Sequence, residues 1–343
     1  VRAESGKLAA GLTISGTNST LDGSRDAAHG TTHSLGAGGP VRYLRMMAKV
    51  AGVLLVVVVA GIGMAHVIAG RHIGERMTVA GHDLVVGNDS VVLARGERVA
   101  TALGKCAECH GPDLGGKQFV DIGPVMTLYA TNLTRGEGGI GAAYSPRDWE
   151  RALRHGVAPD GRKLLFMPSH EYRHLADDDM AALVAYLQTR PAVDRRHDAP
   201  QGVGPIGRVL YLQGDMDLLP AELIDQAAAH RPLAPTGADV LALGQYMIDA
   251  GGCRGCHGPT LSGGPIPGAP PEMPVVANIT PTGIGHYTEA QFRTLMREGR
   301  RPSGAMIDTV NMPVRYTRLL TDEEIAAAYA YLKTVPPKAY GGR

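Results

Sequence analysis

A long apolar run near the start of the chain predicts a membrane-spanning helix. Residues Val50–Ala69 contain no Asp, Glu, Lys or Arg over twenty positions, which at ~1.5 Å per residue just crosses the hydrocarbon core of a bilayer. We place this transmembrane anchor at residues 46–69. The alternative is a cleaved signal peptide, because Val67-Ile68-Ala69 before Gly70 would pass as a cleavage site. The run is longer than the ~7–15 residues of a usual signal core, which favours an anchor, and either interpretation exports the rest of the chain.

Residues 1–40 precede this run and show no apolar period. They are rich in Gly, Ser, Thr and Ala, and such a segment buries too little apolar surface to offset the entropy of ordering it. We therefore predict a disordered leader. The alternative is that the leader is untranslated, because the chain starts without methionine and Val41, Met46 and Met47 are plausible starts.

After the anchor, helical patterns with start and stop signals appear in two sets of three. Thr288 and Thr321 begin capping boxes, and Ser145 precedes a proline at a first helical position. The predicted helices cover about residues 92–103, 145–154 and 177–190, and then about 239–249, 288–298 and 321–335. The fold class is therefore predicted to be all-α, with two small helical domains at residues 90–190 and 238–337.

The two sets belong to a duplicated unit, because short segments recur at a nearly constant offset. Gly-Pro-Asp-Leu at 111–114 matches Gly-Pro-Thr-Leu at 258–261, and Asn-Leu-Thr at 132–134 matches Asn-Ile-Thr at 278–280. Met-Pro also recurs, at 167–168 and 312–313. Residues 191–237 lie between the copies and are rich in proline, but they include apolar residues. We predict that they form an inter-domain strap packed across both domains.

Each copy contains one Cys-x-x-Cys-His motif, and the two motifs hold all four cysteines of the chain. Two thiols on one helical turn add to the vinyl groups of a haem and the following histidine binds the iron, so the motif predicts covalently bound haem c. Two such motifs are not expected by chance from this composition. The predicted attachment residues are Cys106, Cys109, Cys253 and Cys256, and the predicted proximal iron ligands are His110 and His257.

Paired cysteines have three other uses. A four-sulfur zinc site usually separates its pairs by ~15–20 residues, whereas these pairs lie in separate repeats. A thioredoxin-like redox pair requires a flanking βαβ pattern, which neither motif has. Two structural disulfides are the third alternative. Haem explains the repeated histidine, which none of the three requires.

Composition adds two constraints. Only 5% of residues are aromatic, and two buried porphyrins would supply apolar bulk that such a core lacks. The formal net charge is +1, with 20% charged residues, which gives no reason to expect a nucleic acid as partner.

The sixth position of each iron has a methionine candidate at the same place in both copies. Met167 and Met312 each precede a proline in the loop before the last helix, and the proline stiffens the approach. A thioether ligand raises the reduction potential, and six-coordination leaves no position for oxygen or peroxide. Three histidines without counterparts in the second copy are alternative ligands of the first iron: His155, His170 and His174. Three other methionines are predicted to be packed: Met126, Met180 and Met306.

Three matching pairs of polar residues have two interpretations each. The asparagines either donate to a haem propionate or cap a turn, and the arginines either pair with propionates or satisfy helix carbonyls. The tyrosines contact haem or, as we favour, pack between helices. The pairs are Asn132 and Asn278, Arg154 and Arg297, and Tyr186 and Tyr331.

With these motifs the chain resembles the class I cytochrome c fold, duplicated into a membrane-anchored dihaem cytochrome c like the cytochrome c subunits of bacterial periplasmic dehydrogenases. The resemblance covers about residues 94–336. It implies two haem c groups, each with histidine and methionine on the iron, in domains on the periplasmic side of the bacterial inner membrane. Many dehydrogenase cytochrome subunits carry three haems, whereas this chain has two motifs.

The function that follows is electron transfer, not enzymatic catalysis. The two haems would relay single electrons in the periplasm from a dehydrogenase or quinol-oxidising complex to a terminal oxidase or soluble cytochrome, with membrane lipid around the amino-terminal helix. The alternative is a dihaem enzyme, such as a peroxidase or sulfur-compound oxidoreductase, with an open position on one iron. Binding of carbon monoxide at one reduced haem would distinguish that enzyme from the carrier.

Overall fold

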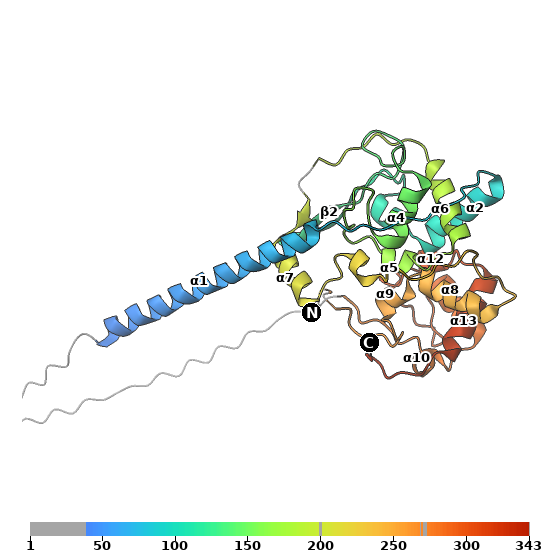
Figure 1. Ribbon diagram of the computed structural model, residues 1–343. Coiled ribbons are helices and arrows are strands. Elements are labelled where there is room, and N and C mark those ends of the chain that lie inside the picture. The colour runs from blue at the N-terminus through green and yellow to red at the C-terminus, as the bar shows by residue number, and fades with distance from the viewer. Residues whose placement is uncertain (1–38, 199–200, 268, 270–272, 343) are drawn as a thin grey trace, which may run out of the picture. The chain divides into compact units, whose positions relative to one another are not determined.

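The computed structural model describes residues 39–198, 201–267, 269 and 273–342, so all but the last two residues of the predicted leader lie outside the described residues. Helix α1 spans Gly39–Gly74 (Figure 1) and extends beyond the predicted anchor at both ends. Its segment Val41–Gly74 is long and apolar enough to cross a membrane. The chain divides within α1 into two units, residues 1–55 and 56–343, and both copies of the repeat lie in the second.

The first copy consists of helices α2 to α6, and its three predicted helices are confirmed. Asp89 caps the first of them by accepting from the backbone of Val91 and Val92, each at 3.0 Å. Ser145 and Asp148 form the capping box of the second. The elements of this copy are α2 (Ser90–Arg98), a π-helical turn η1 (Val99–Leu103), α3 (Ala107–His110), α4 (Pro146–His155), α5 (Ser169–Tyr172) and α6 (Asp177–Gln188).

The second copy has the same order of long helices, with the short helix α10 added and without a π-helical turn, and its three predicted helices are also confirmed. Capping boxes at Thr288 and Thr321 start its last two long helices, as the sequence predicts. The elements of this copy are α8 (Val240–Ala250), α9 (Cys253–His257), α10 (Pro281–Ile284), α11 (Glu289–Glu298), α12 (Val314–Thr317) and α13 (Asp322–Thr334).

In each copy the first and last long helices cross at a glycine. A Cβ atom at Gly96 of α2 would clash with the carbonyl oxygen of Ala182 in α6. A Cβ atom at Gly244 of α8 would clash in the same way with the carbonyl of Ala327 in α13. Close backbone approach without a side chain is a reason for glycine inside a helix, where it otherwise lowers stability. The crossing helices contribute much of the buried core of both copies.

A small antiparallel sheet is the main feature that the sequence did not predict. Strands β1 (Gln118–Ile122) and β2 (Met126–Tyr129) form a hairpin, and β3 (Gly202–Val203) pairs with the other edge of β2. The all-α class is confirmed for the helical framework of both copies, and the sheet is an addition to the first. Its strands are too short to produce a clear alternating pattern.

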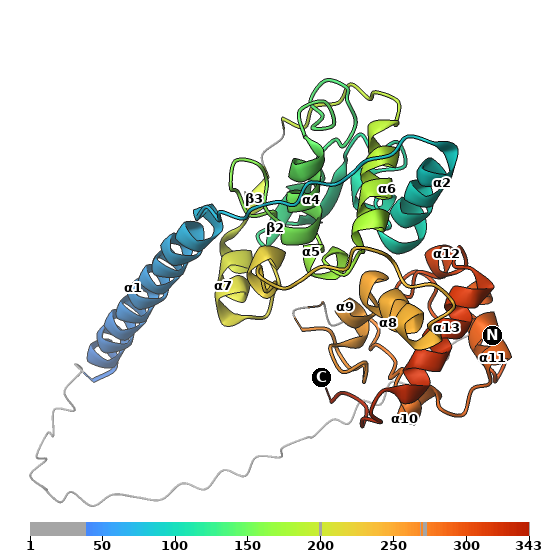
Figure 2. The ribbon, with the colours of Figure 1, turned by 45° about the vertical axis from the view of Figure 1, so that its right-hand side comes forward.

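The inter-domain strap, residues 191–237, packs mainly on the first copy. It contains β3, helix α7 (Pro205–Gln213) and a 3-10 turn η2 (Pro220–Leu223). Its apolar residues form a second core cluster with β2: Met126, Leu128, Val203, Leu218 and Leu219. The last part of the strap then leads to α8 of the second copy (Figure 2). The strap therefore packs mainly on the first copy, and it also reaches the second copy at Gly237, which lies against Glu323 of α13.

Candidate haem-binding sites

The first Cys-x-x-Cys-His motif follows the π-helical turn η1 and forms the short helix α3. His110 is buried, and its Nδ1 lies 2.7 Å from the carbonyl oxygen of Thr131. A carbonyl can only accept, so Nδ1 carries the proton and Nε2 carries the lone pair that a metal binds. Burial lowers the pKa of His110, which also favours the neutral ring that ligates metals.

The second motif has the same arrangement in helix α9. His257 is buried to the same extent as His110, at 8% exposure, and its Nδ1 lies 2.8 Å from the carbonyl oxygen of Ala277. Thr131 and Ala277 occupy equivalent positions, each directly before the repeated asparagine. Both histidines are therefore held in the orientation and tautomer of an axial imidazole ligand, so the donor set fits an iron porphyrin at both sites.

The cysteines do not form the alternative sites that their pairing allowed. Burial raises the pKa of Cys106 to about 12 and that of Cys253 to about 11, and it also raises the pKa of Cys109. In the described ranges, Cys106, Cys109 and Cys253 form no disulfide. The single group of His, Cys, Asp and Glu side chains that is close enough to share a metal, among the described residues, contains no cysteine. A four-sulfur zinc site is therefore not assembled.

A buried indole in the first copy provides a further feature that suits a haem. Trp149 in α4 is 2% exposed, and its Nε1 has no hydrogen-bond partner among the described residues. Leaving such a donor unpaired in the core is costly, and a propionate oxygen would satisfy it. Phe292 stands at the equivalent position of the second copy and is also buried. Sequence reasoning missed this residue, although it is the one tryptophan of the chain.

The repeated asparagines cap turns. Asn132 accepts from the backbone of Thr134 at 2.9 Å through Oδ1 and donates to the carbonyl of Val193 at 2.7 Å through Nδ2. Asn278 accepts from the backbone of Thr280 at 2.8 Å and donates to the carbonyl of Lys338 at 2.9 Å. Each asparagine therefore ties the loop that carries the histidine-bonded carbonyl to the segment after the last helix.

The repeated arginines satisfy helix ends. Arg154 donates to the buried carboxylate of Glu150 at 2.7 Å, to the carbonyl of Leu175 at 2.9 Å and to Asp177 at 2.8 Å. Arg297 donates to the carbonyl of Arg318 and, at 2.8 Å, to Asp322. Both arginines link the second long helix of their copy to the start of the last one.

The predicted methionine ligands lie in equivalent local structures. Met167 and Met312 are half-buried at the edge of the main core. Each precedes a proline that caps a short helix, α5 or α12, and each accepts a 2.7 Å bond from the backbone of the second residue after it. The two methionine loops therefore occupy equivalent positions beside the core, one in each copy.

The alternative ligands and the other methionines have different surroundings. Nδ1 of His155 lies 2.7 Å from Oε1 of Gln226, and burial lowers the pKa of His170 and of His174.

Met126 and Met180 are buried, at 2% and 0% exposure, as predicted. The prediction that Met306 is packed is wrong, because its side chain is 56% exposed in the loop before Met312.

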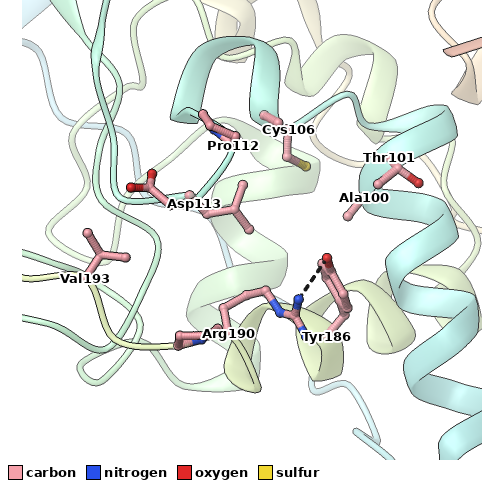
Figure 3. A pocket seen from close by; sticks show the side chains of 11 residues that line it. Ala100, Thr101, Cys106, Pro112, Asp113, Tyr186, Arg190 and Val193 are labelled. Carbon is pink, nitrogen blue, oxygen red and sulfur yellow. Dashed lines mark hydrogen bonds between the residues drawn. The ribbon is translucent and has the colours of Figure 1, made fainter. Parts of the chain in front are cut away.

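A cavity of about 280 Å³ adjoins the first attachment residue (Figure 3). Cys106, Tyr186 and Arg190 line it, and Nη1 of Arg190 donates to the hydroxyl of Tyr186 at 3.1 Å. Tyr186 also packs beside Gly96 at the helix crossing. Tyr331 packs beside Gly244 at the corresponding crossing and accepts from Arg254 at 3.1 Å. Both tyrosines therefore serve in helix packing.

The two copies contact each other through equivalent elements. Glu171 of α5 lies against Gly252 and Gly255 at the second motif, so that a Cβ atom at either glycine would clash with its carboxylate. In the reverse direction, Tyr316 of α12 donates to Glu108 of the first motif. Glu171 corresponds to Tyr316, and Gly255 to Glu108. Each haem motif is therefore packed against the helix that follows the repeated methionine of the other copy.

A second set of contacts surrounds the first. Arg98 of α2 donates to Glu324 of α13 at 3.0 Å, and Tyr246 of α8 donates to Asp179 of α6. Glu324 and Asp179 are equivalent positions in the first turn of the last helix. Lys105, one residue before the first motif, reaches the carbonyl of Gly251 at 2.7 Å. The interface thus has approximate two-fold character, which the sequence alone did not reveal.

Comparison with known families agrees with this geometry. Residues 241–336 match the family described as cytochrome c, and residues 92–187 match the family described as cytochrome c oxidase, cbb3-type, subunit III. Each matched segment contains one motif, its buried histidine and its repeated methionine. The fold and the paired sites define a c-type cytochrome with two domains and two covalently bound haem c groups, as the motifs predict.

Individual relatives make the assignment more specific. A dihaem c-type cytochrome of Cereibacter sphaeroides is 30% identical over 275 residues, which cover 71% of this chain and 86% of that one. The chain belongs to the family of dihaem c-type cytochromes. It is also similar to the gluconate 2-dehydrogenase cytochrome c subunit of Pantoea cypripedii, at 30% identity over 291 residues. The alcohol dehydrogenase (quinone) cytochrome c subunit of Gluconacetobacter polyoxogenes is 29% identical over 282 residues. These two matches cover 73% of this chain but only 61% and 57% of the respective relatives.

Proposed function

We propose that this dihaem cytochrome carries single electrons, with His110 and Met167 as axial ligands of one iron and His257 and Met312 as axial ligands of the other. The observation that carries the proposal is the matched geometry of the two sites. Each histidine is oriented by a backbone carbonyl at 2.7 or 2.8 Å, and each methionine directly precedes the proline that caps a short helix.

The chemistry of this ligand set suits electron transfer. A thioether ligand raises the reduction potential of a haem, and two protein ligands leave no position on the iron for oxygen or peroxide. In the first copy, the indole of Trp149 would hold a haem propionate, whereas Phe292 has no donor to offer in the second. The two sites would therefore differ in electrostatic environment, and we expect two separate midpoint potentials.

The contact between the copies supports transfer from one haem to the other. Each motif packs against the helix that follows the methionine of the other copy, through Glu171 on one side and Tyr316 on the other. Hydrogen bonds of Arg98 and Tyr246 hold the two copies in this arrangement. Attachment sites that lie at a common interface favour a short route between the two cofactors.

We further propose that the donor is a periplasmic dehydrogenase or quinol-oxidising complex and that the acceptor is a terminal oxidase or soluble cytochrome. Relatives whose names place them as cytochrome c subunits of gluconate 2-dehydrogenase and of quinone-dependent alcohol dehydrogenase support a dehydrogenase partner. Helix α1 would anchor the chain in the bacterial inner membrane, since its segment Val41–Gly74 is long and apolar enough to cross a bilayer. The haem domains would lie in the periplasm, where the attachment of haem c takes place.

The ligand assignment is tested with three matched methionine variants of the haem-loaded protein. Met167→Ala should open one iron to carbon monoxide and lower one midpoint potential, and Met312→Ala should do the same to the other haem. Met306→Ala removes an exposed methionine from the same loop as Met312 and should change neither property. An unaltered spectrum and redox titration in Met167→Ala or Met312→Ala would refute the corresponding ligand. Binding of carbon monoxide by the unmodified protein would instead favour a dihaem enzyme.

The partner assignment needs a separate experiment. Affinity isolation of the tagged full-length chain from detergent-solubilised membranes should recover a dehydrogenase or quinol-oxidising complex that reduces both haems when its substrate is added. Recovery of redox partners that cannot reduce the haems would contradict this part of the proposal and leave the ligand assignment unaffected.

A further inference from the structure

Two histidines and an aspartate meet on the surface of the first copy, in a group separate from the haem motifs. One ligand atom each of His82, Asp177 and His230 can be chosen so that all three lie within 4.8 Å of one another. Nδ1 of His230 lies 2.8 Å from Oδ2 of Asp177. The imidazole rings of His82 and His230 have centroids 4.6 Å apart and are inclined at 50°.

The three residues come from three separate segments. His82 lies between α1 and α2, Asp177 is the first residue of α6, and His230 lies in the inter-domain strap. Segments this distant in sequence meet only because the tertiary structure places them together. Among the described residues this is the only group of side chains close enough to share a metal ion. Local chain geometry cannot explain why its three members lie together.

Backbone hydrogen bonds hold each segment in place without help from these side chains. The backbone N–H of His82 donates to Glu150 at 2.9 Å, and Glu150 is fully buried. The backbone N–H of Asp177 donates to the carbonyl of Arg231 at 2.8 Å, directly after His230. Farther along the strap, the backbone of Ala234 donates to Asp178 at 2.9 Å. The backbone positions of all three potential ligands are thus set in advance, which reduces the entropy lost when they bind an ion.

The carboxylate of Asp177 is oriented for a shared role. Its Oδ1 accepts from Nη2 of Arg154 at 2.8 Å, while its Oδ2 faces His230. Hydrogen bonding of one oxygen to a neighbour is the usual arrangement for a carboxylate that ligates a metal through the other. The charge of Arg154 is balanced by its ion pair with buried Glu150 at 2.7 Å, so it does not make the group electropositive.

Comparison with the second copy shows which contacts of this aspartate belong to the repeated fold and which involve the histidines. Asp322 is the equivalent of Asp177 and pairs with Nη2 of Arg297 at the same distance, 2.8 Å. Among the described residues, no metal-ligating group forms around Asp322. The aspartate–arginine pair therefore belongs to the repeated fold, and the two histidines are an addition made only in the first copy.

We propose that His82, Asp177 and His230 bind one divalent transition-metal ion of the zinc type, apart from the two haems. Two imidazoles and a carboxylate form a three-ligand set that zinc accepts with water in the fourth position. Ligand atoms of a tetrahedral zinc ion lie about 3.3 Å apart, given metal–ligand distances near ~2.0–2.1 Å. Ligand atoms within 4.8 Å of one another reach this spacing when rotation about the side-chain torsions of the exposed imidazoles moves them by up to about 1.5 Å. Bound zinc would tie the segment after α1 and the strap to the first copy.

The test uses the full-length, haem-loaded protein in detergent, stripped with a chelator, dialysed and titrated with zinc chloride by calorimetry. We expect one saturable site per chain. Substitution of a residue that only hydrogen-bonds to a metal ligand typically lowers metal affinity roughly 10–100-fold. Loss of a direct ligand should cost at least as much, so His82→Ala and His230→Ala should each lower the affinity for zinc by that factor or more. His286→Ala removes an exposed histidine of the second copy and should bind zinc like the unmodified protein.

Two further measurements distinguish this site from zinc bound elsewhere on the protein. The haem absorption spectrum of each variant should match that of the unmodified protein, because His82 and His230 are exposed and lie outside both haem motifs. X-ray absorption at the zinc edge should report nitrogen and oxygen ligands without sulfur, which excludes binding to cysteines that lack haem. Absence of a saturable site in the unmodified protein, unweakened binding in both histidine variants, or sulfur in the zinc shell would overturn the proposal.

Discussion

The carboxyl group of Glu171 is expected to make the stability of this cytochrome depend on pH. Its side chain is inserted between the two copies, against Gly252 and Gly255 at the second haem motif. Burial raises its pKa from 4.5 to about 7, and the nearby ammonium of Lys105 offsets only part of this effect. The folded protein therefore holds Glu171 protonated over a pH range in which the unfolded chain has released the proton.

The sign of the effect follows from linkage. A carboxyl group whose pKa is higher in the folded state contributes its full stability below pH 4.5 and loses it as the pH rises to about 7. Each tenfold change in the acid dissociation constant corresponds to about 1.4 kcal/mol. The difference between 4.5 and about 7 therefore lowers the free energy of unfolding by roughly 3 kcal/mol at pH 8 relative to pH 4.

The variant Glu171→Gln keeps the size of the side chain and cannot ionise. It should match the unmodified protein near pH 4.5 and exceed its free energy of unfolding by roughly 3 kcal/mol at pH 8. Guanidinium unfolding, followed by haem absorption at several pH values between 4.5 and 8, measures this difference. Glu97→Gln, which removes an exposed carboxyl group on α2, serves as the control and should leave the pH profile unchanged. Parallel pH profiles for the unmodified protein and Glu171→Gln would refute the reasoning.

Three other substitutions test the packing that positions the sites. Gly96→Ala places a methyl group against the backbone of α6 and should cost about 1–3 kcal/mol in chemical unfolding; normal stability would contradict the close crossing. Arg154→Met removes the main cation beside fully buried Glu150 and should lower the free energy of unfolding by about 3–5 kcal/mol, so an unchanged melting temperature would argue against the pair. Tyr246→Phe removes the donor to Oδ2 of buried Asp179, while Oδ1 keeps its bond from Arg95, and this loss should cost about 1–3 kcal/mol. Hydrogen exchange should also rise at the start of α6, and unchanged protection there would show that the contact between copies does not depend on this hydroxyl.

Some features of the molecule were predictable because their causes are local. Helix boundaries follow from caps and prolines within a few residues, which is why the cap at Ser145 and the capping boxes at Thr288 and Thr321 appear where the pattern places them. The capacity for two haems likewise follows from two pentapeptides whose thiols and histidine act within one helical turn. The recurrence of these signals at a constant spacing was enough to predict the duplication.

Other features were wrongly predicted or missed because a local pattern does not report burial. Met306 has an apolar side chain of the kind usually found in a core, but this side chain is exposed to solvent. The hairpin of β1 and β2 is stabilised by strap residues that are distant in sequence, such as Val203 and Leu218, so its short strands gave little signal of their own. The unpaired indole of Trp149 is visible only when its surroundings are known.

The sequence by itself therefore determined the helices, the repeat, the haem motifs and the membrane-length helix, because each depends on neighbours within a few turns of the chain. Only the tertiary structure decided the contact of each motif with the other copy, the burial that raises the pKa of Glu171, and the meeting of His82, Asp177 and His230. These depend on distances between residues that are far apart in sequence, and such distances are set by the packing of the whole fold.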